Sequence, residues 1–301
     1  MSNMLFVSGA SGALGRRVLA HLLDTHHIAP ADIIAGTRTP EKLADFAARG
    51  VQVRHTDFDD PPSLAASFAG AARLLLISTD AIDRPGRRVV QHTAAIDAAR
   101  QAGVRHIVYT SMPRPEDSLV TFIAPDHVAT ERAIEASGLG WTILRNSWYM
   151  EIYTHALTDI LASGTWYSSA GNGRSAPIAR EDCARVAAAA LASSGDGNAR
   201  YDVTGPELLT VDETAAIVSR ASGKPIRVAH VDDDQYAEAL QAGGVPPPFV
   251  PFWVSIDANT RAGLVAIGSD AVKTLTGRAP QTLADFLSTC LPAAATAAAA
   301  V

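Results

Sequence analysis

Short runs of consecutive apolar residues recur along the first half of the chain, separated by segments with helical spacing. The first run, residues 4–8, is followed by a turn and then by Val18, Leu22 and Leu23, which share one helix face. Later runs are rich in Val, Ile and Leu and cover 33–36, 51–55, 74–78, 104–110 and 141–144. Strands that are buried on both faces show such runs, and their alternation with helices indicates right-handed crossovers. The pattern predicts an α/β protein with a doubly wound parallel sheet.

The rhythm of strands and helices weakens after about residue 149. A Gly171-Asn172-Gly173 turn, an Ala-rich helix over 182–193 and a break at 246–248 indicate a smaller α/β lobe that caps the substrate site. The run 200–203 is expected to return to the sheet as a late strand. These features predict the following organisation: residues 1–150 form the main domain, 177–205 return to it, 151–292 form the smaller lobe, and 293–301 are a disordered Ala-rich tail.

The turn between the first strand and the first helix has the sequence Gly-Ala-Ser-Gly-Ala-Leu-Gly over residues 9–15. Such a turn points backbone N–H groups and the positive end of a helix dipole at an anion, and its small residues let a pyrophosphate approach closely. In a strand–turn–helix setting, this pattern predicts a Rossmann dinucleotide site. The residues expected to form it are Gly9, Ser11, Gly12, Ala13, Leu14 and Gly15. The alternative is a tight turn that binds nothing.

The end of the second strand bears on which dinucleotide is bound. NAD-binding versions of this arrangement place an acidic residue there, at the ribose 2′-hydroxyl. Here the strand ends in Thr37-Arg38, and Asp32 comes too early. Arg38 suits a 2′-phosphate, and Lys42 faces the same way if a helix begins by Pro40. We therefore expect NADPH as the cofactor, the alternative being that Arg38 is a solvated loop cation.

Other residues at strand ends are expected along the cofactor path. Asp57, with Phe58 beside it just past the third strand, is expected either to bind the adenine amino group or to serve as a turn residue. Ser78, Thr79 and Thr110 follow or end the fourth and fifth strands, and ligands lie at that edge of open sheets.

Composition and charge restrict the possible partners. The chain has 301 residues, 48% of them hydrophobic, a formal net charge of −6 and no basic cluster. This balance disfavours nucleic acid or an anionic membrane as a partner. The two cysteines, Cys183 and Cys290, form no CxxC pair, and the histidines show no metal-ligand spacing, so no metal is expected. Without a signal-peptide pattern or a membrane-length apolar run, we expect a cytoplasmic monomer or homodimer acting on small molecules.

Three segments carry a resemblance to a known family. They are Tyr109-Thr110-Ser111, residues 127–138 (HVATERAIEASG), and Leu144-Arg145-Asn146-Ser147-Trp148-Tyr149. With the glycine-rich turn they resemble the atypical short-chain dehydrogenases/reductases of the NmrA-like branch. Within that branch the similarity is to type 2 NAD(P)H:quinone oxidoreductases and triphenylmethane reductases. The resemblance runs from the first strand to about Leu291.

The chain departs from the wider family at its catalytic pair, Tyr-x-x-x-Lys. None of its six tyrosines has a lysine four residues later. If Glu131 marks the family register, His127 stands at the lysine position and Ile123 at the tyrosine position. Reducing a ketone leaves an alkoxide that needs a positioned acid, whereas reducing a quinone leaves a phenolate-type anion with a conjugate-acid pKa of about 10. The missing pair therefore favours a quinone or a cationic dye carbon over an alcohol or ketone.

The resemblance and the strand ends together indicate which residues surround the nicotinamide. Asn146 is expected at the substrate mouth, where its amide can donate to an acceptor oxygen, and Trp148 and Tyr149 are expected to wall an aromatic pocket. His127 is expected either to be a weak acid with a pKa of about 6.5 or to bind the nicotinamide ribose. Ser111 is expected to contact substrate or cofactor, or to be a structural hydroxyl.

Other residues in this region carry no site prediction. Arg145 is expected to be a buried ion-pair partner. The later aromatic residues can roof the pocket or belong to ordinary core, namely Trp166, Tyr167, Phe249, Phe252 and Trp253.

These observations favour an NADPH-dependent reductase that transfers hydride directly to quinones or similar electron-poor aromatic acceptors. One alternative is a non-catalytic NADP(H)-sensing regulator of the NmrA type, which also lacks the Tyr/Lys pair. Another is a reductase of triphenylmethane or azo dyes.

Overall fold

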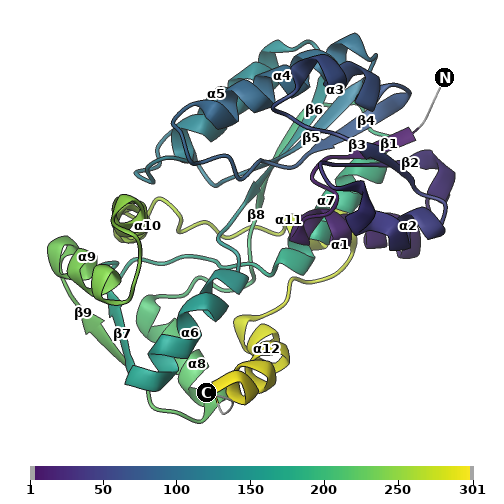
Figure 1. Cartoon of the computed structure of the whole chain (residues 1–301). Helices are drawn as coiled ribbons and strands as arrows, with labels where there is room; N and C mark the ends of the chain where they lie inside the picture. Colours follow the sequence, from purple (N-terminus) through teal and green to yellow (C-terminus); the bar gives the residue numbers. More distant parts are fainter. Residues whose placement is uncertain (1–3, 299–301) are drawn as a thin grey trace.

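The computed structural model describes residues 4–298 and contains a seven-stranded sheet in the order β3-β2-β1-β4-β5-β6-β8 (Figure 1). Every neighbouring pair in it is parallel. The strands are β1 Met4–Val7, β2 Ile33–Thr37, β3 Gln52–His55, β4 Ala71–Leu76, β5 His106–Ser111, β6 Gly140–Asn146 and β8 Ala199–Val203. The predicted doubly wound sheet is confirmed, and β1 and β4 lie where the strand order reverses.

Helices cover both faces of this sheet (Figure 1). One face carries α1 (Ala13–Asp24), α2 (Ala44–Ala48) and α7 (Arg180–Ala192), and the other carries α3 (Pro61–Phe68), α4 (Arg87–Gln101) and α5 (Ala124–Ala136). The 3-10 helices η1 (Pro30–Asp32) and η2 (Pro40–Leu43) flank β2. Each face has its own apolar core, because strands without exposed faces present side chains to both layers.

Two later segments belong to the body of the sheet. β8 pairs with β6, and α7 packs against α1 in the same apolar core. The six-residue helix α11 (Ala271–Thr276) also packs against α7, with Val272 fully buried in that core. Helix α11 is thus a second segment that returns to the main domain, and it lies inside the segment 151–292 that is predicted to form the lobe. So short a helix has no periodic pattern from which its contacts could be predicted.

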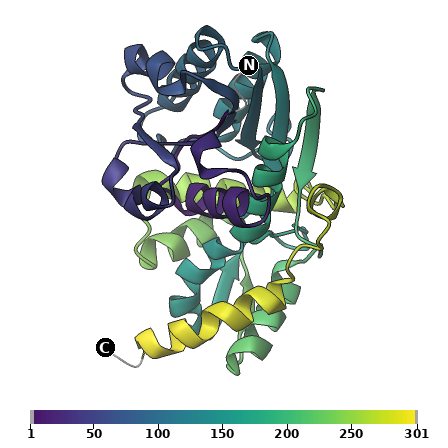
Figure 2. The same ribbon diagram turned by 90° about the vertical axis from the view of Figure 1, so that its right-hand side faces the viewer.

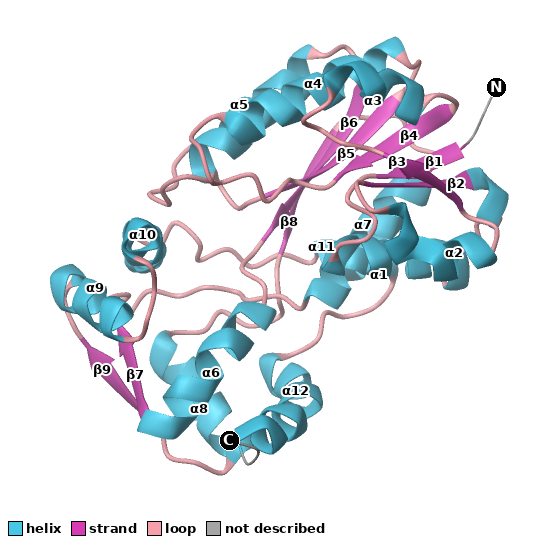
Figure 3. Cartoon of the chain, viewed as in Figure 1, coloured by secondary structure: helices cyan, strands magenta, loops and turns pink. Residues whose placement is uncertain are grey.

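The remaining elements form the smaller lobe, which lies below the sheet in Figures 1 and 2. It combines a two-stranded parallel sheet with helices (Figure 3), as the prediction of an α/β lobe requires. Its elements are α6 Glu151–Ser163, β7 Thr165–Ser168, α8 Val211–Ser222, β9 Arg227–His230, α9 Asp233–Ala242, η3 Pro247–Phe249, α10 Val250–Arg261 and α12 Leu283–Ala298. Its core gathers apolar residues of α6, α8 and α12.

Helix α12 continues to Ala298, into the segment 293–301 that was expected to be disordered. Its first turns are anchored by Leu283, Phe286 and Leu287 in the lobe core, so the alanines extend an existing helix and need no new nucleus. Residues 299–301 of the predicted tail lie outside the described residues. Within the described part, no helix has the length and apolar character to cross a membrane.

Candidate functional site

The turn between β1 and α1 has the backbone that an anion site requires. Gly9 has a φ of 57°, and Gly12 is the N-cap of α1 with no side-chain cap. Gly12 and Ala13 are exposed, so the N–H groups at the start of α1 face solvent. A Cβ on Gly15 would lie 2.4 Å from the carbonyl oxygen of Gly9, so only glycine lets the helix pack this closely. The turn can therefore take an anion at the start of α1.

Polar residues at the end of β2 extend the site beyond this turn. The hydroxyl oxygens of Thr37 and Ser11 lie 2.7 Å apart, which joins the end of β2 to the turn. Arg38 is exposed. The hydrogen bond from Arg87 and, less strongly, the charge of Arg38 hold the pKa of Asp59 below its usual range. Arg38 is therefore near the end of β3 as well as β2.

No carboxylate stands at the end of β2, where a ribose 2′-hydroxyl would need one. Asp32 lies in η1, before the strand begins. Lys42 lies in η2, which begins at Pro40 as expected but is a 3-10 helix. With three residues per turn, the spacing from Arg38 to Lys42 does not by itself place both on one face. The side chain of Lys42 is exposed.

Asp57 and Phe58 follow β3. The Asp57 carboxylate accepts a hydrogen bond of 3.0 Å from the N–H of Asp59, as a turn residue does, and its other oxygen keeps the capacity to accept from an adenine amino group. Phe58 is half-buried and packs against the core beside α3 and α4.

Hydroxyl groups join the ends of β4 and β5. The Thr110 hydroxyl oxygen accepts a hydrogen bond of 2.9 Å from the N–H of Ser78. The Thr79 N–H donates to Nε2 of His92 (3.1 Å), and Nδ1 of this ring lies 2.9 Å from the Thr130 hydroxyl. Burial and then the charge of Arg88 lower the pKa of His92 to about 3, so the ring is neutral. These bonds hold the two strand ends and α4 in register.

Ser111 ends β5 and is committed to a buried ion pair. Its hydroxyl donates to Glu131 (2.6 Å), which also pairs with Arg145 at 2.7 Å. Glu116 binds the same guanidinium at 2.8 Å. The structure thus supports the structural reading of Ser111, and Arg145 is the buried ion-pair partner that was expected.

His127 lies on α5 with only 4% of its surface exposed. Its Nδ1 is 2.8 Å from the hydroxyl of Tyr109. Burial, followed by the charges of Arg88 and His92, lowers the pKa of His127 well below its ordinary value. The weak-acid role requires a pKa of about 6.5, so that the ring is partly protonated near neutral pH. A ring with a much lower pKa is neutral there, which argues against this role. With Tyr109 donating to Nδ1, the ring proton lies on Nε2 and can be donated to a ligand.

Buried polar atoms without a partner gather around the end of β6. Asn146, the last residue of that strand, donates from Nδ2 to the Tyr149 hydroxyl (3.3 Å), and its Oδ1 meets no partner among the described residues. Burial raises the pKa of Tyr149, so its hydroxyl stays protonated and can donate too. Turning the Asn146 amide by 180° would therefore keep this bond and free its N–H groups. Nε1 of Trp148, two residues later, also lacks a partner in the described part of the chain, so both side chains keep hydrogen-bonding capacity that a ligand could use.

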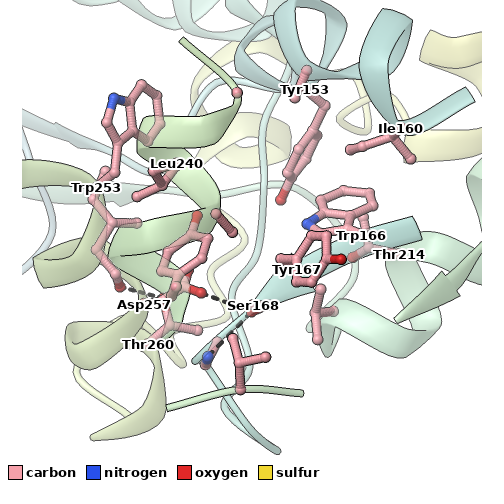
Figure 4. Close-up of a pocket in the computed structure, with 18 of the residues that line it drawn as sticks. Tyr153, Ile160, Trp166, Tyr167, Ser168, Thr214, Leu240, Trp253, Asp257 and Thr260 are labelled. Carbon is pink, nitrogen blue, oxygen red and sulfur yellow. Dashed lines mark hydrogen bonds between the residues drawn. The ribbon is translucent and has the colours of Figure 1, made fainter. Parts of the chain in front are cut away.

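A cavity of about 960 Å³ extends from Trp148 and Tyr149 into the smaller lobe. Figure 4 shows Trp253 on one side of it and Tyr153 and Trp166 on the other. Tyr167 lines it too, so three of the five aromatic residues without a site prediction belong to the cavity wall. Phe252 packs instead with the loop that follows β5. A cavity of this size with aromatic walls suits a planar aromatic ligand.

The cavity also contains acidic groups. The Asp257 carboxylate accepts hydrogen bonds from the Ser168 hydroxyl (2.7 Å, Figure 4) and the Ser169 N–H (2.8 Å), and burial raises its pKa. Asp159 and Glu238 line the same cavity, and none of its lining residues within the described part is Lys, Arg or His. Its walls are therefore aromatic and electronegative.

The predicted cofactor residues are brought together at one edge of the sheet. They lie at the carboxyl ends of β1 to β5 or in the first helical turns that follow: Gly9, Ser11, Gly12, Ala13, Leu14, Gly15, Thr37, Arg38, Lys42, Asp57, Phe58, Ser78, Thr79, Thr110 and His127. Asn146 and Tyr149 follow at the end of β6, beside the cavity.

Sequence reasoning missed Asp257 and Arg88. Asp257 comes from α10, far along the chain, and no local pattern distinguishes it. For Arg88 the sequence contained one signal: Arg87 and Arg88 are the first residues of α4, and the helix dipole disfavours cations at that position.

Several known proteins are similar to this chain in both sequence and fold. The chain is 32% identical to quinone oxidoreductase 2 of Escherichia coli K12 over 285 residues, which span 95% of this chain and 98% of that protein. The crystal structure of the E. coli QOR2 complexed with NADPH matches with a TM-score of 0.89, covering 95% and 99% of the two chains. Citrobacter sp. triphenylmethane reductase complexed with NADP(H) matches with a TM-score of 0.88 at 34% identity, with the same coverage.

A third relative is the NAD(P)H azoreductase of Xenophilus azovorans, 30% identical over 284 residues, which cover 94% of this chain and 96% of that protein. Residues 9–194 match the family model described as NAD(P)H-binding. The chain therefore belongs to the NAD(P)H-binding family, and its predicted resemblance to the NmrA-like reductases is confirmed.

Proposed function

We propose that this protein is an NADPH-dependent reductase that passes hydride directly to quinones or similar electron-poor aromatic acceptors. One observation carries the proposal: the glycine-rich turn and Asn146 lie at the same edge of the sheet, and Tyr149, which is hydrogen-bonded to Asn146, lines the aromatic cavity. Ligands of open α/β sheets bind at this edge. The names of the relatives, which are reductases of quinones and dyes, support the same activity.

The residues at the sheet edge fit a phosphorylated dinucleotide. The N–H groups at the start of α1 would bind the pyrophosphate, since Gly12 leaves that helix end uncapped. Arg38 would bind the 2′-phosphate, where an NAD-specific site would have a carboxylate. His127 would donate from Nε2 to the nicotinamide ribose, which is the second of the two roles predicted for it. The coenzyme supplies two electrons as hydride, so the protein needs no flavin.

The protein's own contribution is to position the acceptor and to tolerate its charge. Asn146 would donate an amide N–H to the acceptor oxygen after the rotation described above. A quinone becomes a phenolate-type anion with a conjugate-acid pKa of about 10, which water can protonate. A site without the Tyr/Lys pair, and with a neutral His127, is sufficient for that reaction.

The cavity also favours a second candidate, a reductase of cationic dyes. Its walls combine aromatic rings with Asp159, Glu238 and Asp257 and, among the described residues, include no basic side chain. A delocalised aromatic cation would be attracted to such walls. A dye cation takes up hydride without needing a proton, so this activity also fits the missing pair.

A panel of acceptors tests the proposal. NADPH absorbance is followed with quinones, triphenylmethane and azo dyes, and simple ketones. We expect oxidation with quinones or dyes and none with ketones. Tight NADPH binding without turnover on any acceptor would identify a sensing regulator, and turnover with ketones alone would show that a proton donor has been overlooked. A cytoplasmic location and a monomeric or dimeric state remain predictions.

A further inference from the structure

Arg88 is a buried cation without an adequate partner. It opens α4, and 7% of its surface is exposed. Its Nε and Nη1 atoms are buried and have no hydrogen-bond partner, and no ion pair joins it to a carboxylate anywhere in residues 4–298. A guanidinium remains protonated under all physiological conditions. Burying such a charge unpaired costs several kcal/mol, so an anionic or strongly polar ligand is expected beside it.

The groups that sense the charge of Arg88 show where it lies. One helical turn after Arg88, the ring of His92 lies 5.6 Å from that of Tyr109 on β5, and its Nδ1 lies 2.9 Å from the Thr130 hydroxyl on α5. Burial lowers the pKa of Arg88, and the titratable groups close enough to act on that pKa include Tyr109 and Tyr149, just after β6. Arg88 in turn lowers the pKa of His127 on α5. Residues of β5, β6 and α5 surround only one half of the sheet edge. The charge therefore lies in that half, on the side of the sheet edge where Tyr149 lines the aromatic cavity.

This position separates Arg88 from the phosphates of the coenzyme. The glycine-rich turn follows β1 and Arg38 follows β2, and in the strand order β3-β2-β1-β4-β5-β6-β8 both lie on the other side of β4 from β5 and β6. A dinucleotide spans such an edge with its adenosine half over β2 and β3. Arg88 is thus on the nicotinamide side, where the acceptor must meet the coenzyme.

Two carboxylates come near Arg88 without neutralising it. Asp80 and Asp126 act on its pKa, but neither carboxylate takes part in an ion pair or a hydrogen bond with Arg88 among the described residues. Asp80 is exposed and therefore well solvated. Burial raises the pKa of Asp126, which further weakens it as a counter-ion. The guanidinium therefore keeps a net positive charge that no carboxylate of the described residues neutralises by an ion pair.

We infer that Arg88 is the group that stabilises the negative charge formed on the oxygen of a carbonyl acceptor during reduction. The inference rests on the proposed function. The quinone takes up one hydride, which is one proton with two electrons, and becomes the hydroquinone monoanion, while NADPH loses that hydride and becomes NADP⁺. Water then protonates the oxygen. Arg88 supplies in this way the electrostatic stabilisation that the missing Tyr/Lys pair would otherwise provide.

The sign of the charge gives a kinetic test. With a quinone, negative charge develops beside Arg88, whereas with a cationic triphenylmethane dye a positive charge disappears. Arg88→Met keeps the apolar volume, so it should fold and melt at or above the wild-type temperature. We expect kcat/KM for the quinone to fall about 100-fold, while kcat/KM for the dye stays unchanged or rises. Arg88→Lys should recover part of the quinone activity, and Arg100→Met, at the exposed end of the same helix, is the matched control.

An equilibrium measurement keeps this test independent of turnover. Binding of 4-nitrophenol to the protein with NADP⁺ is titrated by absorbance at pH values below and above the pKa of the free phenol. We expect the wild type to bind the phenolate about tenfold more tightly than the phenol, which equals a shift of about one unit in the pKa of the bound probe. Arg88→Met should abolish this preference.

Three results would overturn the inference. The first is that the wild type binds the phenolate no more tightly than the phenol, or binds neither of them. The second is an equal loss of quinone and dye turnover in Arg88→Met. The third is a matching loss of NADPH affinity, which would assign Arg88 to the coenzyme. If the wild type oxidises NADPH with no acceptor, the proposed function fails, and the phenol titration alone decides the role of Arg88.

Discussion

Replacing Gly15 by alanine tests whether the turn after β1 combines close helix packing with coenzyme binding. The added Cβ would lie 2.4 Å from the Gly9 carbonyl oxygen and 2.7 Å from the Ala10 Cα. Carbon atoms pack best at about 3.5–4.0 Å, so α1 and the turn must separate by about 1 Å. Both obstructing atoms belong to the backbone, so no side chain can rotate away. Overpacking of this kind costs about 1–3 kcal/mol.

The assay is thermal unfolding of the coenzyme-free protein, followed by NADPH titration. At about 2.1 cal/mol/K per residue, the unfolding entropy of a chain of 301 residues converts that cost into a fall in Tm of about 2–5 °C. The shift also displaces the N–H groups at the start of α1. Losing one charge-assisted hydrogen bond costs about 1.5–3 kcal/mol, so NADPH should bind about tenfold more weakly or worse.

Gly12→Ala is the matched control. Gly12 has a φ of −74°, which alanine adopts freely, and its Cβ would lie 3.2 Å from the Gly9 oxygen. The Tm should therefore fall less than for Gly15→Ala, since the Gly9 oxygen needs to move by only a few tenths of an ångström. NADPH affinity should fall because the new methyl group lies at the exposed helix start where the pyrophosphate approaches. A wild-type Tm for Gly15→Ala would refute the packing argument. A lowered Tm with normal NADPH affinity would refute the assignment of the turn as the pyrophosphate site.

Three further predictions concern the coenzyme, the acceptor and pH. Arg38→Ala should weaken NADPH binding by about 1.5–3 kcal/mol in a fluorescence titration and leave NADH unchanged, and equal losses would remove the 2′-phosphate assignment. Asn146→Ala should lower kcat for quinones without changing the Kd of NADPH, so a parallel loss of binding would assign the amide to the coenzyme. The folded-state pKa of His92 is about 3, below that of the unfolded chain. Its contribution to stability is thus complete above about pH 6.5 and is lost as the pH falls toward 3, and His92→Gln should flatten the decline of Tm over that range.

Local patterns predicted the sheet because they reflect local physics. Continuous apolar runs require burial on both faces, and the glycine-rich turn requires a positive φ at Gly9 and a close approach at Gly15. Both requirements can be read from neighbouring residues. The return of the chain to the sheet at β8 was predicted for the same reason, whereas the six-residue α11 offered no periodicity and was assigned to the lobe.

Side-chain chemistry was less predictable because it depends on burial and on partners far along the chain. Of the two roles predicted for His127, the weak acid needs an ordinary pKa, whereas burial, followed by the charges of Arg88 and His92, lowers that pKa. Ser111 was predicted either to contact a ligand or to be structural, and the bond of its hydroxyl to Glu131, 20 residues away in sequence, could not be read from neighbouring residues. Local sequence cannot supply the dielectric environment or the counter-ions that decide such cases.

The sequence by itself determined the parallel sheet, the anion-binding turn, the missing Tyr/Lys pair and the absence of an acid after β2, because each follows from residue types at fixed local spacing. Only the tertiary structure decided two features: an acidic aromatic cavity built from α6, β7, α9 and α10, and a buried guanidinium, Arg88, without an ion-pair partner among the described residues. The physical reason is that a cavity and an unpaired charge are properties of packing between distant segments, and spacing along the chain does not encode them.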